Sequence, residues 1–438
     1  MRGMDLNQDE TPLSNSSMAA KSTFAALQLL CPYNVAARTM PDSPHSIPDA
    51  SAISLGMQRQ LEIYQLGLSG KKLSVPIPVS QLEKKAAESL TPQAYDYITG
   101  SASGERTARA NLEAFDHWRI VPRMLRDVSQ RDLSVELLGA KLPVPVLLGP
   151  IGVQSIIHSE AELAAARAAA SLGIPFVLST VSSRSFEEVA QSMGPAQRWF
   201  QLYWGKDHEL TASFLKRAET SGYSALVVTL DTSMLGWRER DLQHPYLPFL
   251  LGDGLANYFT DPLFCSRLEK PPDADPTAAI RLWASLYSNT ALTWKDLAWL
   301  RRQTRLPIVL KGILHPEDAR LALDHGASAI IVSNHGGRQV DGAVAALDAL
   351  PPVVEAVRDK IPVLFDSGIR HGADAIKSLA LGARAVLLGR LYLWGLAVAG
   401  EAGVRDVVQN FLADLDITMG LSGLRSVKEL NASILVRT

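Results

Sequence analysis

A histidine follows an apolar run in the stretch AIIVSNHGGRQVDG, residues 329–342. His335 leaves that run beside two glycines, which let a ligand approach the backbone closely, so we expect it to act on a ligand as an acid or base. Asp231 ends another apolar run, and a carboxylate can orient and charge-stabilise such an imidazole, as it does in a catalytic triad. A helix cap or an internal ion pair is the alternative role for Asp231.

Three further cationic side chains indicate anion or carbonyl chemistry. Lys311 ends an apolar run, where a buried ammonium group needs a partner or a task. It could form a Schiff base, hold a phosphate, or stabilise negative charge on an electron-accepting ring. Arg238 and Arg338 indicate carboxylate recognition, because a guanidinium offers a two-point grip, although either one alone would suit the surface. Tyr97 is equally explained by helix packing, and no His or Cys spacing predicts a metal site.

Eight short apolar runs recur from residue 144 onward, each ending in small or polar residues. Such non-alternating runs are typical of strands buried on both faces. Helical patterns separate them, and Ser159 with Glu162 and Ser185 with Glu188 predict capping boxes. Eight βα units predict a closed (β/α)8 TIM barrel of the α/β class. The runs are residues 144–150, 176–180, 199–203, 225–231, 307–312, 329–333, 362–368 and 385–390.

The carboxyl ends of these strands are the expected active site, because barrels of this kind place their chemistry there. The loops after the seventh and eighth strands commonly form a phosphate site, which makes Gly368, Arg370, Gly389 and Arg390 candidate ligands. A phosphorylated substrate and a phosphate-bearing cofactor are equally compatible with that pattern.

The chain divides into a leader and one large domain. Residues 1–60 are rich in Ser, Pro and Asp and predict a flexible leader, and residues 61–438 form the barrel domain. Asp231 and Lys311 are 80 positions apart, against 22 between Lys311 and Ser333. We therefore expect an insertion at about residues 232–306 that forms an active-site lid, an oligomer contact or a membrane-surface patch.

Composition excludes several classes of partner. The net charge is −2, with 43 basic and 45 acidic residues, so we expect no binding to nucleic acid or to an anionic membrane. Two cysteines provide no disulfide framework, and no apolar run reaches the roughly 18 residues of a membrane span. We expect a cytoplasmic protein.

Several longer motifs identify a family. The chain resembles the FMN-dependent α-hydroxy-acid oxidase family from about residue 80 to 430, through SNHGGRQ, FQLYWGKD, LTWKDLAWLRRQTRLPIVLKGI and LFDSGIRHGADAIKSLALGA. DTSMLGWRERDL and LPFLLGDGLANYFTDPLF look closest to its L-lactate 2-monooxygenase branch. The resemblance implies that FMN and O2 serve to oxidise a small L-2-hydroxy acid, in that branch L-lactate to acetate, CO2 and water. An oxidase that releases the keto acid and H2O2 is the alternative, followed by a membrane-associated dehydrogenase.

The resemblance also implies a role for each motif residue. His335 is the catalytic base with Asp231 as its partner, and Tyr203 and Lys311 complete the catalytic set. Substrate is bound by Tyr97, Tyr203, Arg238, His335 and Arg338. The FMN-binding residues are Pro150, Ile151, Gly152, Ser179, Gln201, Tyr203, Thr229, Lys311, Ser333, Asp366, Ser367, Gly368, Arg370, Gly389 and Arg390. Val181 replaces a Trp of several oxidases and leaves room, and the chain is expected to form a tetramer or octamer.

Two interpretations from other classes compete with this one. A Schiff-base aldolase would use Lys311 and the phosphate site, but would leave His335 and the two arginines without a task. A non-catalytic barrel that acts as a binding or regulatory module would leave a bound flavin unreduced by any hydroxy acid.

Overall fold

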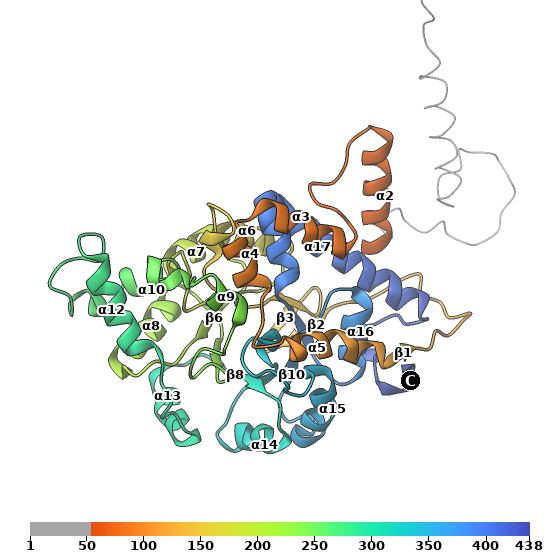
Figure 1. Ribbon diagram of the computed structural model, residues 1–438. Helices are drawn as coiled ribbons and strands as arrows, with labels where there is room; N and C mark the ends of the chain where they lie inside the picture. The colour runs from red at the N-terminus through yellow and green to blue at the C-terminus, as the bar shows by residue number, and fades with distance from the viewer. Residues whose placement is uncertain (1–53) are drawn as a thin grey trace, which may run out of the picture. The chain divides into compact units, whose positions relative to one another are not determined.

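Eight parallel strands close into a barrel in the computed structural model, which describes residues 54–438 (Figure 1). Their order is β10-β11-β4-β5-β6-β7-β8-β9, so strands that follow one another in sequence are neighbours in the barrel. The (β/α)8 TIM barrel predicted from the eight apolar runs is confirmed. The strands are β4 (Val146–Leu148), β5 (Phe176–Ser179), β6 (Arg198–Leu202), β7 (Leu226–Thr229), β8 (Ile308–Ile313), β9 (Ala329–Val332), β10 (Val363–Phe365) and β11 (Ala385–Leu388).

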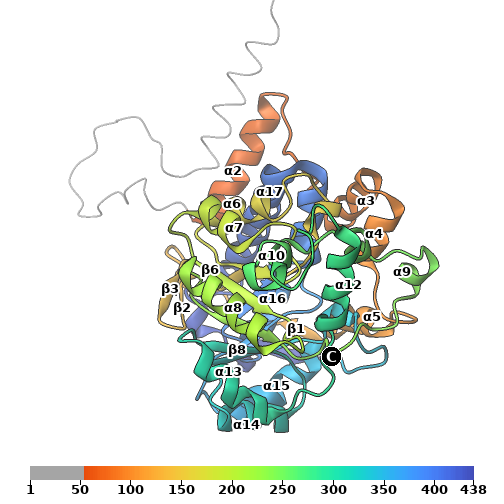
Figure 2. The same ribbon diagram turned by 90° about the vertical axis from the view of Figure 1, so that its left-hand side faces the viewer.

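A helix follows each strand, and these helices surround the barrel (Figures 1 and 2). They are α6 (Glu162–Ser171), α7 (Phe186–Met193), α8 (His208–Thr220), α13 (Leu297–Gln303), α14 (Pro316–Asp324), α15 (Ala346–Val357), α16 (Gly372–Ala380) and α17 (Arg390–Leu421). The last of these is interrupted by non-helical backbone at Ala399 and Gly400. None of the helices described between residues 54 and 438 combines the length and apolar character needed to cross a membrane.

The segment before the barrel supplies helices and a hairpin. Residues 54–60 and 73–438 form one unit, and residues 61–72 belong to a separate one. The predicted leader lies outside the described residues except at its end, where α2 (Leu55–Leu68) begins. Next come α3 (Val79–Ser89), α4 (Pro92–Thr99), α5 (Arg106–Asp116), β1 (Trp118–Ile120), β2 (Val135–Leu137) and β3 (Ala140–Leu142), and β1 pairs with the C-terminal β12 (Leu435–Arg437).

The long connection between β7 and β8 folds into short helices. These are α9 (Glu239–Gln243), η3 (Pro248–Leu251), α10 (Ala256–Phe259), α11 (Pro262–Cys265), α12 (Pro276–Tyr287) and η4 (Trp294–Asp296). Figures 1 and 2 both show α10 and α12 beside α8. Arg217 of α8 pairs with Asp261 at 3.2 Å and with Glu187 at 3.0 Å, which ties the middle of the insertion to the helices of the barrel.

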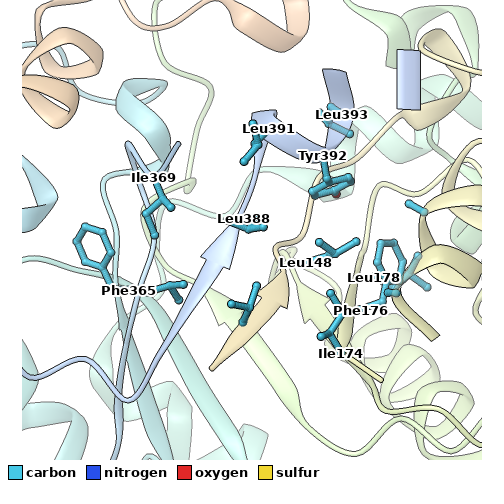
Figure 3. Packing of buried hydrophobic residues seen from close by; sticks show 14 of the residues in the cluster. Leu148, Ile174, Phe176, Leu178, Phe365, Ile369, Leu388, Leu391, Tyr392 and Leu393 are labelled. Carbon is cyan, nitrogen blue, oxygen red and sulfur yellow. The ribbon is translucent and has the colours of Figure 1, made fainter. Parts of the chain in front are cut away.

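Successive residues of each strand face opposite sides of the barrel wall. Leu147, Val177, Trp199 and their equivalents fill the interior together with Val135 and Leu137 of the β2–β3 hairpin. Their sequence neighbours belong to a second buried cluster, which joins the outside of the strands to the helices. Figure 3 shows part of this outer cluster, where residues on β4, β5 and β11 lie near the start of α17: Leu148, Phe176, Leu178, Leu388, Leu391 and Tyr392.

One of the two predicted capping boxes is present. Ser185 and Glu188 form theirs at the start of α7. The box predicted for Ser159 and Glu162 is wrong, because α6 begins at Glu162 itself. The Glu162 carboxylate instead accepts hydrogen bonds from the backbone N–H groups of Gln154 (3.1 Å) and Ser183 (3.0 Å), which join the loops after β4 and β5.

Candidate active site

The polar floor of the site is formed by the inward-facing residues that follow the apolar interior layer of the barrel on each strand. Two residues beyond the apolar layer of the barrel interior, the next inward position is small or polar on every strand. These positions are Gly149, Ser179, Gln201, Thr229, Lys311, Ser333, Asp366 and Gly389. Since Ser179 pairs with Gln201 and Thr229 with Lys311 in the parallel register, the barrel brings these side chains to one level.

A pocket of about 1060 Å³, open to solvent, lies above this floor. Most of the residues that the sequence nominated line it: Tyr97, Pro150, Ile151, Gly152, Tyr203, Arg238, Lys311, His335, Arg338, Asp366, Ser367, Gly368, Arg370, Gly389 and Arg390. The other five, Ser179, Gln201, Thr229, Asp231 and Ser333, are not among its lining residues. Asp231 and Ser333 nevertheless contact residues that are.

His335 and Asp231 come together at the end of β9 and β7. His335 Nδ1 lies 2.8 Å from Asp231 Oδ1, and the Tyr203 hydroxyl lies 3.5 Å from His335 Nε2. Burial lowers the pKa of His335, and the opposing effect of Asp231 does not restore it, so the imidazole is neutral at pH 7. Burial acts to raise the pKa of Asp231, but the charges of His335 and Lys311 lower it to about 2. A neutral imidazole with a carboxylate behind it can act as a general base.

Glycines next to this pair permit its geometry. Gly312 has a φ of +104°, and a Cβ there would lie 2.9 Å from Asp231 Cγ. Gly337, the second glycine after His335, has a φ of +79°, and a Cβ there would lie 2.6 Å from the backbone N of Ala108. The loop after β9 can therefore pack against α5 only where a side chain is absent.

Lys311 is buried between an acid and a hydroxyl. Its Nζ lies 3.3 Å from Asp366 Oδ2 and donates to Ser333 Oγ at 2.9 Å. Burial acts to lower the pKa of Lys311, but the charges of Asp366 and Asp231 outweigh it and raise the pKa. The amine is therefore protonated, which argues against the Schiff-base aldolase because that chemistry needs a neutral nucleophilic amine.

Two arginines lie together beside the base. Arg338 Nη1 donates to the carbonyl oxygens of Tyr97 (2.6 Å) and Gly100 (2.7 Å). Arg238 Nε donates to the carbonyl of Arg338 at 3.3 Å, and its Nη2 donates to Gln339 Oε1 at 3.0 Å. Burial and the charge of Arg238 lower the pKa of Arg338 to about 10. A bound carboxylate would relieve this repulsion.

The ends of β10 and β11 form a second cationic region. Gly389 precedes the first turn of α17, so the N-terminal N–H groups of that helix lie beside the pocket. Arg370 Nη1 donates to the carbonyl of Ile369 at 2.9 Å, and its guanidinium lies 4.9 Å from the Trp394 ring centre. Arg390 differs from the expected free phosphate ligand, because it donates to the carbonyls of Ile98, Gly100 and Gly336 and to Ser101 Oγ at 2.8–3.1 Å.

The charge balance of the pocket calls for an anion. Five cationic side chains line it, against a single carboxylate, that of Asp366. Within residues 54–438, Arg338, Arg370 and Arg390 have no carboxylate within 4.0 Å. Burial and the neighbouring guanidinium groups lower the pKa of Arg390 to about 9. Gln201 Nε2 is buried and, among the described residues, has no hydrogen-bond partner. These features fit a ligand that carries a phosphate, a polar ring edge and room for a carboxylate beside it.

Comparison with known proteins agrees with this chemistry. The chain matches the FMN-dependent dehydrogenase family over residues 86–437. The chain belongs to this family. It is 45% identical over 382 residues to the FMN-dependent alpha-hydroxy acid dehydrogenase qulF of Penicillium citrinum, and the match covers 86% of this chain and 95% of that protein. It is also 45% identical over 362 residues to an L-lactate oxidase of Lysinibacillus sphaericus, covering 83% and 93%.

Comparison with solved structures agrees with the matches to these relatives. A crystal structure of mandelate oxidase matches with a TM-score of 0.73 and 37% identity, over 83% of this chain and 99% of that one. The protein is thus an FMN-dependent oxidoreductase that acts on 2-hydroxy acids. The pocket accounts for this activity, since it joins a base and paired guanidinium groups to an anion site for the cofactor.

Sequence reasoning missed several residues that complete the wall of the pocket. They are Ile98, Thr232, Leu235, Phe249, Tyr287 and Leu393. Most have no sequence signal of their own, because helices of the insertion and of α17 bring them back over the strand ends. Thr232 is the exception, since it directly follows Asp231.

A polar network outside the pocket joins the insertion to α4. Arg240 Nη2 lies 2.6 Å from Glu105 Oε2 and its Nη1 lies 3.4 Å from Asp96 Oδ1. His244 Nε2 lies 2.9 Å from Asp96 Oδ2. We name these four residues the outer latch. It connects the segment that carries Arg238 to the helix that carries Tyr97. Because each contact is partly exposed, a single ion pair contributes little to the stability of this connection, and the network of pairs contributes more.

Proposed function

We propose that this enzyme oxidises a small L-2-hydroxy acid, with L-lactate as the first candidate, and that O2 completes the reaction to acetate, CO2 and water. The observation that carries the proposal is the pairing of Arg238 and Arg338 beside a neutral His335. The wall next to them is apolar, with Ile98, Val181, Leu235, Phe249 and Tyr287, and suits a substrate with a small hydrocarbon group at its α carbon.

The FMN site is assigned to the strand ends opposite the arginine pair. The residues named below would hold FMN, which would supply the electron-accepting chemistry of the oxidation, with O2 as the final oxidant and H2O2 as its product. Gly368, Gly389, Arg370 and the first turn of α17 would hold its phosphate, and Arg390 would stabilise the backbone that surrounds it. Gln201 Nε2, which has a free donor among the described residues, would bond a polar edge of the ring. Pro150, Ile151, Gly152, Ser179, Tyr203, Thr229, Lys311, Ser333, Asp366 and Ser367 would complete the site.

The protein side chains supply orientation and proton transfer. Arg238 and Arg338 would hold the substrate carboxylate, which places its α carbon and hydroxyl near Tyr203 and His335 Nε2. His335 accepts a proton from the substrate as the electrons leave, and Asp231 stabilises the imidazolium that forms. Lys311 keeps a fixed positive charge at the floor, where negative charge develops during reduction.

The fate of H2O2 decides between two products. If the keto acid stays in the pocket, peroxide adds to its carbonyl carbon, the carbon–carbon bond to the carboxylate breaks, and pyruvate plus H2O2 gives acetate, CO2 and water. If the keto acid leaves first, the enzyme releases pyruvate and H2O2, as expected of an oxidase. The outer latch favours retention, because it holds the Arg238 segment over the pocket. The similarity to an L-lactate oxidase favours release.

Product analysis tests this proposal. The purified flavoprotein is mixed with L-lactate in air, and acetate, pyruvate and H2O2 are quantified together with O2 uptake. The proposal requires one acetate per O2 with little free H2O2. Equal amounts of pyruvate and H2O2 would replace it with the oxidase.

Two predictions concern the state of the protein in the cell. A cytoplasmic location and assembly into a tetramer or octamer stay predictions, which cell fractionation and light scattering of the purified protein would test.

A further inference from the structure

Thr232 has no role in the assignments above, although it lies against the catalytic pair. Its side chain is buried and lines the pocket. Thr232 Oγ1 lies 3.0 Å from Asp231 Oδ1 and 3.2 Å from His335 Nδ1, while those two atoms are themselves 2.8 Å apart. We propose that Thr232 is a positioning residue for the oxidation, whose hydroxyl shares Asp231 Oδ1 with His335 and fixes the imidazole as a base directed at the pocket.

Counting donors and acceptors determines the direction of each hydrogen bond. Asp231 is ionised and can only accept, so the proton between it and His335 is on Nδ1. That leaves the lone pair of Nε2 on the pocket side, near the Tyr203 hydroxyl. The Thr232 hydroxyl then has a single acceptor within this triangle, Asp231 Oδ1, and must donate to it. Oδ1 therefore accepts two hydrogen bonds.

The second carboxylate oxygen of Asp231 shows why the hydrogen bond from Thr232 to Oδ1 matters. Asp231 Oδ2 is buried and has no hydrogen-bond partner among residues 54–438. Rotation of the carboxylate would replace an oxygen that accepts two hydrogen bonds with one that accepts none. The Thr232 hydroxyl therefore raises the free-energy cost of that rotation.

Neighbouring contacts hold Thr232 in this place. Gln339 Nε2 donates to the carbonyls of Asp231 (2.8 Å) and Met234 (2.9 Å), one on each side of Thr232 in the chain. Gly312 removes the side chain that would otherwise displace Asp231. The backbone therefore presents two consecutive side chains, those of residues 231 and 232, to one imidazole.

The charges around His335 set the expected direction of the pH effect. Asp231 raises the pKa of His335, whereas burial, Lys311 of β8 and Arg238 of the insertion lower it, and Tyr203, which directly follows β6, contacts Nε2. Without the Thr232 hydroxyl, Asp231 Oδ1 has a single donor and attracts the imidazolium proton more strongly. The pKa of His335 then rises, and the acid limb of kcat/KM moves to higher pH.

The test compares Thr232→Val, which keeps the shape and loses the hydroxyl, with Thr232→Ser, which keeps the hydroxyl. Both holoenzymes are assayed for kcat/KM with L-lactate against pH, and for the rate of anaerobic flavin reduction by the same substrate. FMN content and far-UV circular dichroism establish that each variant is folded and loaded.

For the valine variant we expect a plateau about tenfold lower and an acid limb about half a unit to one unit higher, as for one charge-assisted hydrogen bond. The serine variant should keep the wild-type limb and most of the plateau. If the valine variant loses rate but keeps the limb, or if serine fails to restore it, Thr232 is only a packing residue and the proposal is wrong. A hydroxy acid other than lactate as the best substrate would change the assay substrate but leave this comparison intact.

Discussion

Replacing Asp231 with Asn removes the charge behind the base while keeping its shape. Lowering the Asp231 pKa from 3.8 to about 2 corresponds to about 2 kcal/mol in favour of the carboxylate. The Coulomb attraction between Asp231 and a charged His335 at 2.8 Å is about 6 kcal/mol at an effective dielectric constant near 20. If the imidazolium forms in the transition state, these two energies bound the loss of kcat/KM between about 30-fold and about 2.5 × 10⁴-fold.

The pH profile of the same variant provides an independent check. Asp231 raises the pKa of His335, so its loss lowers that pKa, and the acid limb should move to lower pH even as the plateau falls. The assay is kcat/KM with L-lactate over the pH range, together with anaerobic flavin reduction. Asp253→Asn is the matched control, because Asp253 lies on the insertion and accepts a hydrogen bond from Ser155. A loss below tenfold, or an acid limb that moves upward, would refute the reasoning.

Three further predictions test the cofactor site, the backbone and the insertion. Gly312→Ala should displace the catalytic carboxylate, and it should lower Tm more than Gly139→Ala does and kcat/KM at least tenfold more. Gly139 is the control because its φ is also positive but a Cβ there would meet nothing within 4 Å. Arg370→Met should weaken FMN binding about 10- to 100-fold in fluorescence titrations and leave riboflavin binding unchanged, whereas Arg384→Met at the opposite end of β11 should change neither. Arg240→Gln should raise the fraction of O2 recovered as free H2O2 and change kcat/KM by less than about threefold; an unchanged fraction would exclude the latch from product retention.

The polar residues at the strand ends could be predicted from the sequence, because the alternation of inward-facing and outward-facing side chains continues past the apolar part of each strand. Once the apolar interior positions are known, residue spacing alone places Ser179, Gln201, Lys311, Ser333 and Asp366 in the next inward layer. The partnership of two residues 104 positions apart also followed, because both end strands of one barrel.

The direction of individual side chains could not be predicted. Arg390 matches the position of a phosphate ligand, but the end of α4 and the loop after β9 leave three carbonyl groups near it, those of Ile98, Gly100 and Gly336, and the guanidinium binds those. The capping box at Ser159 failed for a similar reason, because a buried Glu162 binds two distant loops. Contacts of the insertion with α4 depend on its tertiary path, which has no periodic pattern to reveal it.

Anaerobic reduction of the bound flavin tests the central claim most directly. The purified holoenzyme is mixed without oxygen with L-lactate, D-lactate, glycolate or mandelate, and the visible absorbance of the flavin is followed. The account predicts rapid bleaching by L-lactate, none by D-lactate, and loss of the rapid phase in His335→Gln with FMN still bound. An absorbance that none of these 2-hydroxy acids changes would contradict it, and so would bleaching by L-lactate at the wild-type rate in the His335→Gln variant.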